Sequence, residues 1–311
     1  MDPITHGTIG LALSAFSGQP VSLTNPVSLG CALGAMAPDI DAVIRIFSND
    51  MVYLKHHRGI THSVPALALL ALGVTGVLYP FFPEMPLLQV LFWSFIGALS
   101  HTVFDILNSY GAMLFMKKRK ASLLTLYDPV VSLLAGYLIL APNQGMASHL
   151  AVIGIFLGYL GLRYHLRRRA HDSLMTLYGS GYTVERIDVL PSLLAFYQWD
   201  YIVTARSHQI VGKYNQITGR NTVRRKLRVQ PEFVRLFNQT RAGGYFNAFS
   251  PNLHVHTEHH VDRIVLKATD IRYFMRNRFM HHATVVLDKN HRVLESYIHP
   301  YHPDKAIEIT P

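Results

Sequence analysis

Histidine and aspartate residues lie within, or at the ends of, long apolar segments in the first half of this chain. They are His6, Asp39, Asp41, His57, His62, His101, Asp105 and Asp128. A charged side chain at the centre of a membrane helix costs roughly 2.5–3.5 kcal/mol on insertion scales, so several carboxylates together require a compensating cation. Imidazole and carboxylate groups are also ligands for divalent metals. The pattern therefore predicts a metal site in a membrane protein.

The spacing within each motif supports this interpretation. His101 and Asp105 are four residues apart, so both side chains project from one face of a helix. Asp39 and Asp41 follow Pro38, where a break in the helix lets two carboxylates point toward one centre. Simpler interpretations exist for two residues: His6 as an interfacial residue at a helix start, and Asp128 as the residue that begins the helix at Pro129. A proton or ion pathway through the bilayer would use the same residue types.

Residues 57–63 form the densest motif, with the sequence His-Arg-Gly-Ile-Thr-His-Ser. Gly59 permits a tight turn, and Thr61 can cap the helix that follows. Arg58 offers a planar guanidinium group that suits phosphate or carboxylate. We therefore expect Arg58 to hold developing negative charge on a substrate, and His57 to act as a general base or an additional ligand.

Composition divides the chain into two parts. Of its 311 residues, 50% are hydrophobic and 15% are charged, whereas soluble domains carry about 25% charged residues. Charges are rare up to about Tyr164, and the chain is polar and basic from Arg163 onward, which predicts a membrane domain over 1–166 and a soluble domain over 167–311. The single cysteine, Cys31, excludes an intrachain disulfide and a cysteine-based zinc site.

The first part is predicted to be an α-helical polytopic membrane bundle of about five to six membrane segments. A spanning helix takes about 20 apolar residues, and the first two segments fit either two short spans or one re-entrant hairpin. Basic residues occur in alternate loops only, which places these loops and both termini in the cytoplasm. The apolar segments are Ile4–Phe16, Pro26–Phe47, Ser63–Phe82, Leu87–Leu107, Leu123–Ala141 and His149–Arg163.

The second part is predicted to be a small β-rich cytoplasmic domain, because short β-branched and aromatic runs alternate with Gly, Pro and Asn. A helix is expected over Pro231–Gln239. The basic run Arg220–Arg228 favours a solvated or lipid-facing loop over nucleic-acid binding, and His254, His256, His259 and His260 favour surface positions over a second metal site. The expected strands are Tyr182–Asp188, Gln198–Thr204, Gln209–Tyr214, His254–His256, Arg263–Ala268, Ala283–Leu287 and Val293–Ile298.

These motifs resemble those of the bacterial inner-membrane YdjM/YbcI family, which is described as membrane-bound, predicted metal-dependent hydrolases. The resemblance covers roughly Met1 to Ala141 and implies metal-dependent hydrolysis. The part that follows resembles only longer members of the family. The resemblance rests on Thr5-His6-Gly7, Ala37–Asp41, residues 57–63, His101 with Asp105, and Asp128-Pro129.

The combined expectation is a multi-pass inner-membrane, metal-dependent hydrolase with a cytoplasm-facing site. Four carboxylates would balance two divalent ions, and Zn²⁺, Mn²⁺ and Mg²⁺ all fit the ligand types. A site at the inner headgroup level indicates membrane lipid as a partner and an amphipathic substrate, with a phospholipid or polyprenyl phosphoester as the first candidate. The alternatives are an ion- or proton-coupled transporter and a membrane-anchored regulator with a cytosolic sensor domain. No nucleic-acid partner is expected. The expected metal ligands are His6, Asp39, Asp41, His62, His101, Asp105 and Asp128.

Overall fold

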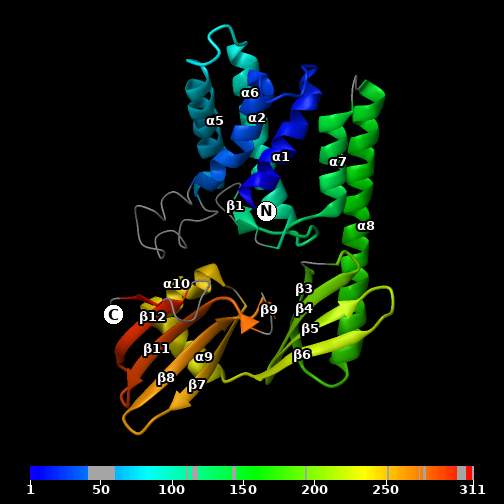
Figure 1. Cartoon of the computed structure of the whole chain (residues 1–311). Coiled ribbons are helices and arrows are strands. Elements are labelled where there is room, and N and C mark those ends of the chain that lie inside the picture. The colour runs from blue at the N-terminus through cyan, green and yellow to red at the C-terminus, as the bar shows by residue number, and fades with distance from the viewer. Residues whose placement is uncertain are drawn as a thin grey trace. The chain divides into compact units, whose positions relative to one another are not determined.

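The computed structural model divides the chain into two compact units (Figure 1). Of the described residues, the first unit contains 1–40, those from 60 to 169 and those from 190 to 198, and the second contains those from 170 to 189 and from 199 onward. The structure describes residues 1–40, 60–109, 111–113, 118–141, 145–192, 195–250, 252–272, 274–275, 278–299 and 306–309.

The first unit is helical. Three of its described helices begin at a proline. The residue before each proline, Asp2, Asn25 or Asp128, caps the helix by accepting hydrogen bonds from backbone N–H groups of the first turn. Three short 3₁₀ turns interrupt the described helical sequence: η1 (Ser14–Ser17), η2 (Ala37–Ile40) and η3 (Ile60–His62). The helices are α1 (Pro3–Leu13), α2 (Pro26–Met36), α5 (Val64–Leu78), α6 (Leu87–Leu107), α7 (Pro129–Leu140) and the first part of α8 (Met146–Gly179).

Helices α2 and α6 pack unusually closely because glycines lie where they cross. A Cβ atom on Gly97 would lie 2.1 Å from the carbonyl oxygen of Cys31, and one on Gly34 would lie 2.1 Å from the carbonyl oxygen of Ser94. No side chain can be accommodated at these distances. The close packing of the two helices places the last turns of α6 against the end of α2, where the candidate site lies.

Two of the described helices, α6 and α8, are long and apolar enough to cross a membrane. Helix α5 has 15 residues and α7 has 12, which gives lengths of about 22 and 18 Å against a hydrocarbon core of about 30 Å. The prediction of five to six membrane segments is therefore wrong. The apolar segments in the sequence are longer than the helices that form within them. In Leu123–Ala141 the helix begins only at Pro129, and the described part of Pro26–Phe47 contains a helix of 11 residues.

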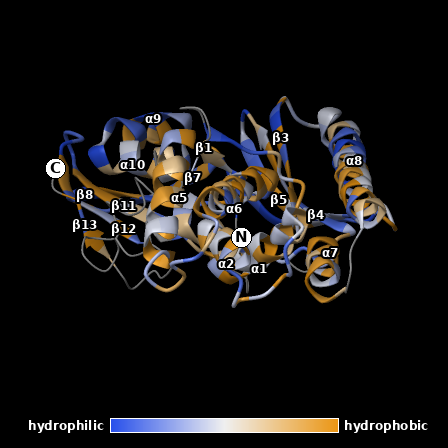
Figure 2. Ribbon diagram, turned by 90° about the horizontal axis from the view of Figure 1, so that it is seen from above, coloured by the Kyte–Doolittle hydropathy of each residue, from blue (hydrophilic) through white to orange (hydrophobic). Residues whose placement is uncertain are grey.

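Apolar side chains remain exposed on the helices of the first unit. Leu133 and Leu140 on α7 are 73% and 81% exposed, and Leu150 and Leu157 on α8 are about 60% exposed. Figure 2 shows this apolar character over α7 and along part of α8. Exposed leucines in such number are expected where a helix faces lipid rather than water.

The second unit is rich in β-sheet, as expected. Its four-stranded sheet has the order β3-β4-β5-β6 and its five-stranded sheet the order β13-β12-β11-β8-β7. The last turn of α8 joins the first sheet through hydrogen bonds of Tyr178 to Tyr201 and Asn221. The strands are β3 (Val184–Pro191), β4 (Gln198–Ala205), β5 (His208–Asn215), β6 (Asn221–Arg228), β7 (Leu253–His259), β8 (Arg263–Asp270), β11 (His282–Asp288), β12 (Val293–His299) and β13 (Ile307–Glu308), with a separate hairpin of β9 (Phe274–Met275) and β10 (Arg278–Phe279).

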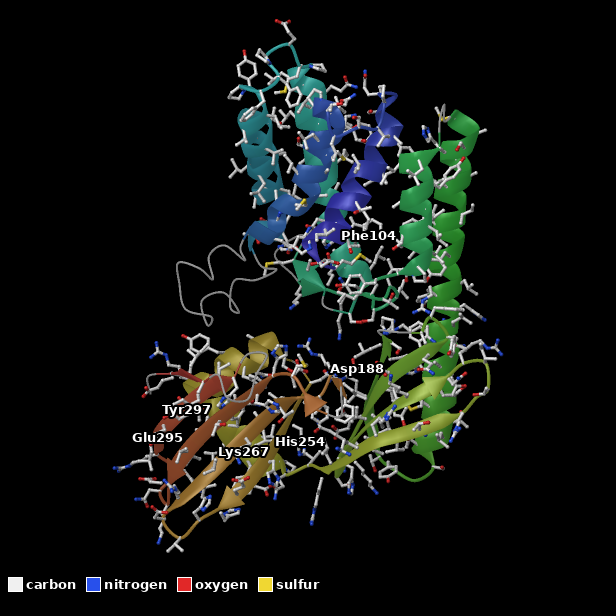
Figure 3. All side chains as sticks on the ribbon, in the orientation of Figure 1. Phe104, Asp188, His254, Lys267, Glu295 and Tyr297 are labelled. Atoms are coloured by element: carbon white, nitrogen blue, oxygen red, sulfur yellow. The ribbon has the colours of Figure 1, made fainter. Side chains whose placement is uncertain are left out.

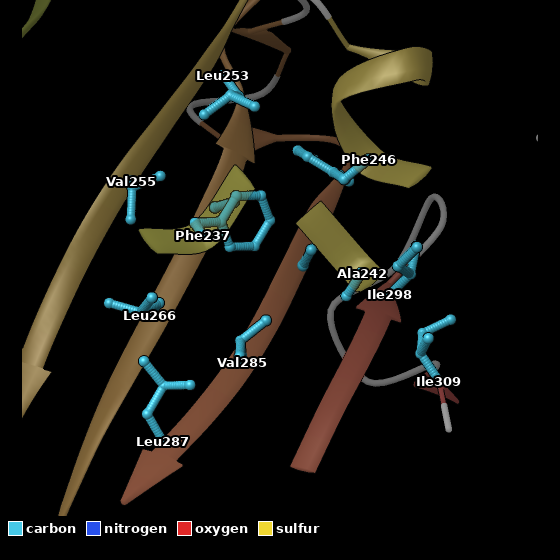
Figure 4. Packing of buried hydrophobic residues seen from close by; sticks show 12 residues of the cluster. Phe237, Ala242, Phe246, Leu253, Val255, Leu266, Val285, Leu287, Ile298 and Ile309 are labelled. Atoms are coloured by element: carbon cyan, nitrogen blue, oxygen red, sulfur yellow. The ribbon is translucent and has the colours of Figure 1, made fainter. Parts of the chain in front are cut away.

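The core of the second unit lies between the five-stranded sheet and two helices, α9 (Pro231–Gln239) and α10 (Arg241–Phe249) (Figure 4). Phe237 and Phe246 from these helices contact Leu266 and Val285 of the sheet. Strand side chains alternate between the two faces, so the opposite face is polar and carries His254, Lys267, Glu295 and Tyr297 (Figure 3).

Each of the seven expected strands overlaps an observed one, and the expected helix Pro231–Gln239 has the bounds of α9. One interpretation of this region is wrong. Residues 221–228 form the edge strand β6 rather than a loop, with Arg224, Arg225 and Lys226 exposed on it. The run of cations did not indicate a strand, because such a run is not typical of a central strand. An edge strand such as β6 can carry it, since its side chains face solvent.

Candidate metal centre

The last two turns of α6 supply His101 and Asp105, both 0% exposed. Their i,i+4 spacing places His101 Nε2 3.8 Å from Asp105 Oδ2. His101 Nδ1 donates a hydrogen bond to the backbone carbonyl of Ala35 at 2.8 Å, across the close α2–α6 contact. This bond fixes the ring and leaves the lone pair of Nε2 directed into the cluster. Figure 3 labels Phe104, which precedes Asp105 on this helix.

The 3₁₀ turn η3 supplies His62, which is also 0% exposed. Its Nε2 lies 3.2 Å from Nε2 of His101 and 3.8 Å from Oδ2 of Asp105. Its other ring nitrogen, Nδ1, contacts the Thr61 hydroxyl at 3.0 Å, and the Thr102 hydroxyl donates to the His62 carbonyl at 3.4 Å. Thr61 therefore orients a histidine, and Ser63 occupies the N-cap position of α5.

His6 and Asp39 complete the cluster from two further elements. The His6 ring, on α1, stacks on that of His101 with 3.7 Å between centroids, and its Nε2 lies 3.4 Å from Oδ1 of Asp105. Asp39 lies in η2, directly after α2, and its Oδ1 lies 3.5 Å from Nε2 of His101. The Asp39 side chain is 9% exposed.

Besides His6, the Oδ1 atom of Asp105 contacts two groups that are not histidines. Oδ1 accepts a hydrogen bond from the Asn108 side-chain amide at 2.8 Å and forms an ion pair with the α-amino group of Met1 at 2.7 Å. The two oxygens thus face different partners, because Oδ1 lies toward His6, Met1 and Asn108, whereas Oδ2 lies toward His62 and His101. Asn108 is 1% exposed and was not recognised in the sequence. Its position three residues after Asp105, one turn along the helix, was the available signal.

Two overlapping groups of buried ligand atoms result, and in each the atoms lie within 4.8 Å of one another. One contains His6, Asp39 and His101, and the other contains His62, His101 and Asp105. Ligands around a tetrahedral zinc ion with bonds of 2.0–2.1 Å are about 3.3 Å apart. The observed contacts of 3.2–3.8 Å around His101 therefore fit a divalent metal without a change of fold.

The remaining predicted site residues fall elsewhere. Asp128 caps α7: its Oδ1 accepts from the N–H groups of Val130 and Val131 at 3.2 and 3.4 Å, and its Oδ2 accepts from the Tyr159 hydroxyl at 2.9 Å. It belongs to neither group of ligand atoms among the described residues. Asp41, His57 and Arg58 lie outside the described residues.

Comparison with known proteins decides the family. The model of the YdjM inner membrane protein family matches residues 1–170, a range that contains every residue of the cluster. The chain belongs to the YdjM inner membrane protein family. The expected resemblance is thereby confirmed. Together with the apolar helices α6 and α8, family membership establishes that this YdjM-family chain is a membrane protein.

The second unit has its own match. A model described as the YfhP C-terminal alpha/beta plait domain matches residues 232–308. Along its whole length the chain is similar to the uncharacterized protein YfhP of Bacillus subtilis (strain 168), with 25% identity over 316 residues that cover 96% of this chain and 94% of the relative. No solved structure matches the chain.

Proposed function

We propose that this YdjM-family protein is a membrane-bound, metal-dependent hydrolase whose buried His/Asp cluster holds a divalent cation. The observation that carries the proposal is the convergence of His62, His101 and Asp105, from two separate elements, with their ligand atoms within 4.8 Å of one another. Buried carboxylates without a cation are unfavourable. Asp39 and Asp105 bring two negative charges, of which the α-amino group of Met1 offsets one, and a divalent ion would offset the other.

The described ligands favour one ion rather than two. Both groups of ligand atoms include His101, whose Nδ1 is bonded to Ala35 and whose single remaining nitrogen can coordinate one metal only. A second ion would depend on Asp41 and His57, outside the described residues. Mixed imidazole and carboxylate donors suit Zn²⁺ or Mn²⁺ better than Mg²⁺, which prefers oxygen ligands and water.

The chemistry that such an ion supplies is activation of water and polarisation of an ester or phosphoester oxygen. The residues of this chain hold and orient the ion's ligands: Ala35 fixes His101, Thr61 fixes His62 and Asn108 fixes Asp105. From the sequence motif we further propose His57 as the general base and Arg58 as the group that holds negative charge on the substrate.

The site is proposed to face the cytoplasm. The basic residues Lys118–Lys120 follow the carboxyl end of α6, the helix that carries His101 and Asp105, and such residues are retained on the inner side. A site at the end of α6 would meet lipid headgroups, which supports an amphipathic phosphoester as substrate.

The test is metal analysis and hydrolysis on the full chain purified in detergent. We expect about one Zn²⁺ or Mn²⁺ per chain, and metal-dependent cleavage of a phosphoester from a panel of phospholipids and polyprenyl phosphates. Asp105→Ala should remove both. A chain that binds no divalent ion at micromolar concentration would refute the proposal.

The principal rival is an ion- or proton-coupled transporter, favoured by the continuous contacts from His6 through His101 to His62. A proton relay needs a titratable group rather than a fixed ligand geometry. Asp105→Glu should therefore support transport, but should lose most of the bound metal if Asp105 is a ligand.

A further inference from the structure

A short hairpin follows α6, and the cations Lys118, Arg119 and Lys120 are among its described residues. Strand β1 (Ala112–Met113) pairs with β2 (Lys118–Arg119), with Ala112 opposite Arg119 and Met113 opposite Lys118. Lys118, Arg119 and Lys120 are all exposed. No acidic residue occurs between Asp105 and Asp128 in the sequence. We call Lys118–Lys120 the basic strand.

Backbone hydrogen bonds attach both ends of this hairpin to the turn that carries Asp105. At its start, Gly111 N–H donates to the Asp105 carbonyl at 3.0 Å. At its end, Ala121 N–H donates to the Ile106 carbonyl at 2.6 Å and Ser122 N–H to the Asn108 carbonyl at 3.2 Å. Strand β1 also lies next to η3, which carries His62. The basic strand is therefore anchored to α6, which carries His101 and Asp105, and its hairpin lies beside η3, which carries His62.

Gly111 makes this attachment possible. Its φ of +74° is a conformation that other residues rarely adopt. A Cβ atom there would lie 2.5 Å from the Arg119 carbonyl oxygen and 2.8 Å from Cβ of Lys120. The absence of a side chain thus brings the basic strand directly against the residue that is hydrogen-bonded to Asp105.

From this placement we propose that Lys118–Lys120 form an anion subsite that binds the phosphate group of the substrate at the metal centre. The inference rests on the proposed function. Asp39 and Asp105 repel an anionic substrate, the ion and the α-amino group of Met1 offset their charge, and exposed cations next to this turn would add the positive charge that attracts a phosphate. Lysine and arginine supply it through charge-assisted hydrogen bonds to phosphate oxygens.

The competing explanation is that these cations only fix membrane orientation. It makes a different prediction, because orientation depends on charge alone and not on where the hairpin lies. A binding subsite depends on both the charges and their attachment at Gly111. Two kinds of variant separate the explanations.

The first variant removes charge. Full-length, metal-loaded protein in phosphatidylcholine nanodiscs is titrated with inorganic phosphate by calorimetry. The triple variant Lys118→Gln/Arg119→Gln/Lys120→Gln should bind phosphate at least about tenfold more weakly than the wild type, since several charge-assisted contacts are lost. The matched control is Arg224→Gln/Arg225→Gln/Lys226→Gln, which removes three exposed cations from β6 in the second unit. Phosphate affinity that is unchanged in both variants, or reduced equally in both, overturns the subsite.

The second variant keeps every charge. Gly111→Ala should displace the basic strand and weaken phosphate binding, whereas a purely topological role predicts no change. Bound metal is measured in each variant, so that loss of phosphate binding through loss of metal is recognised. If Gly111→Ala does not fold, the charge variants decide alone.

The phosphate group can belong to a lipid or to a free molecule, and a change of nanodisc separates these sources. With anionic phosphatidylglycerol in the disc, a lipid-derived group should compete and lower the apparent phosphate affinity of the wild type more than that of the triple variant. A free phosphoester predicts equal effects. Wild-type protein that binds neither metal nor phosphate refutes the proposed function itself, whereas phosphate binding that the triple variant retains in full refutes the subsite alone.

Discussion

The Nε2 atoms of His62 and His101 lie 3.2 Å apart, although 39 positions separate these residues in the sequence. Because Nδ1 of His101 donates to Ala35, its Nε2 accepts a hydrogen bond from Nε2–H of His62 in this arrangement. An ion that replaces the shared proton would find two nitrogens at nearly the separation of about 3.3 Å that tetrahedral coordination requires. The spacing of these two nitrogens thus suits a metal ion in the structure as it stands.

The first prediction concerns the ligands on α6. His101→Ala and Asp105→Ala should each reduce metal affinity by about tenfold or more, since each removes a donor from a buried set. His256→Ala, on β7 of the second unit, is the control and should leave the metal unchanged. Metal content after dialysis against a chelator of known affinity measures the effect. Equal content in all three variants would favour the ion relay.

The second prediction concerns Asn108, a positioning residue. Asn108→Leu keeps the size of the side chain but removes the donor to Asp105 Oδ1. Loss of such an orienting contact should weaken metal binding by about 10–100-fold and change the visible spectrum of the Co²⁺-substituted protein. Asn25→Leu is the control, because it removes the N-cap of α2 and should lower stability without changing the spectrum. Identical spectra for wild type and Asn108→Leu would assign Asn108 a purely structural role.

Much of the candidate site was predictable from the sequence. Residue type and apolar context identified His6, Asp39, His62, His101 and Asp105, and the structure brings all five together. Their orienting partners were not predictable, because the Ala35 carbonyl has no side-chain signature and depends on the α2–α6 crossing. Asp128 shows the limit of the same reasoning. An aspartate before a proline at an apolar segment can cap the helix or bind a metal, and the contacts to Val130, Val131 and Tyr159 show the cap.

The membrane segments were less predictable. Hydropathy measures the length of an apolar run, whereas spanning requires an unbroken helix, and capping residues shorten the helices inside these runs. Asp128 delays the start of α7, and η2 follows α2 at Ala37. In the second unit, β-branched runs located most strands. Strand β6 has no such run, since its place is determined by pairing with β5, a long-range property that composition does not encode.

The third prediction concerns Asp128. As the N-cap of α7 it should contribute to stability and not to metal binding. Asp128→Ala should lower stability by about 0.5–2 kcal/mol, seen as a lower unfolding temperature, while metal content stays at the wild-type value. Asp128→Ser, which retains a capping oxygen, should recover part of the loss. A loss of metal comparable to that of Asp105→Ala would instead make Asp128 a ligand.

The fourth prediction concerns the pH dependence of the second unit. Burial, together with the neighbouring His256, lowers the pKa of His254 from 6.5 to about 4, and its Nδ1 donates to Gln209 on β5. Between these pKa values the unfolded chain binds a proton that the folded chain does not, so stability falls as the pH falls from 6.5 to 4 and is fully retained above 6.5. Burial also lowers the pKa of His281 to about 4, so two groups contribute.

The variant His254→Gln, which retains a donor for Gln209, should reduce the slope of unfolding free energy against pH without abolishing it. Trp199, buried in this unit, reports its unfolding by fluorescence once the other tryptophan is removed by Trp93→Phe. A slope in His254→Gln equal to that of the parent would show that His254 is not held neutral in the folded sheet.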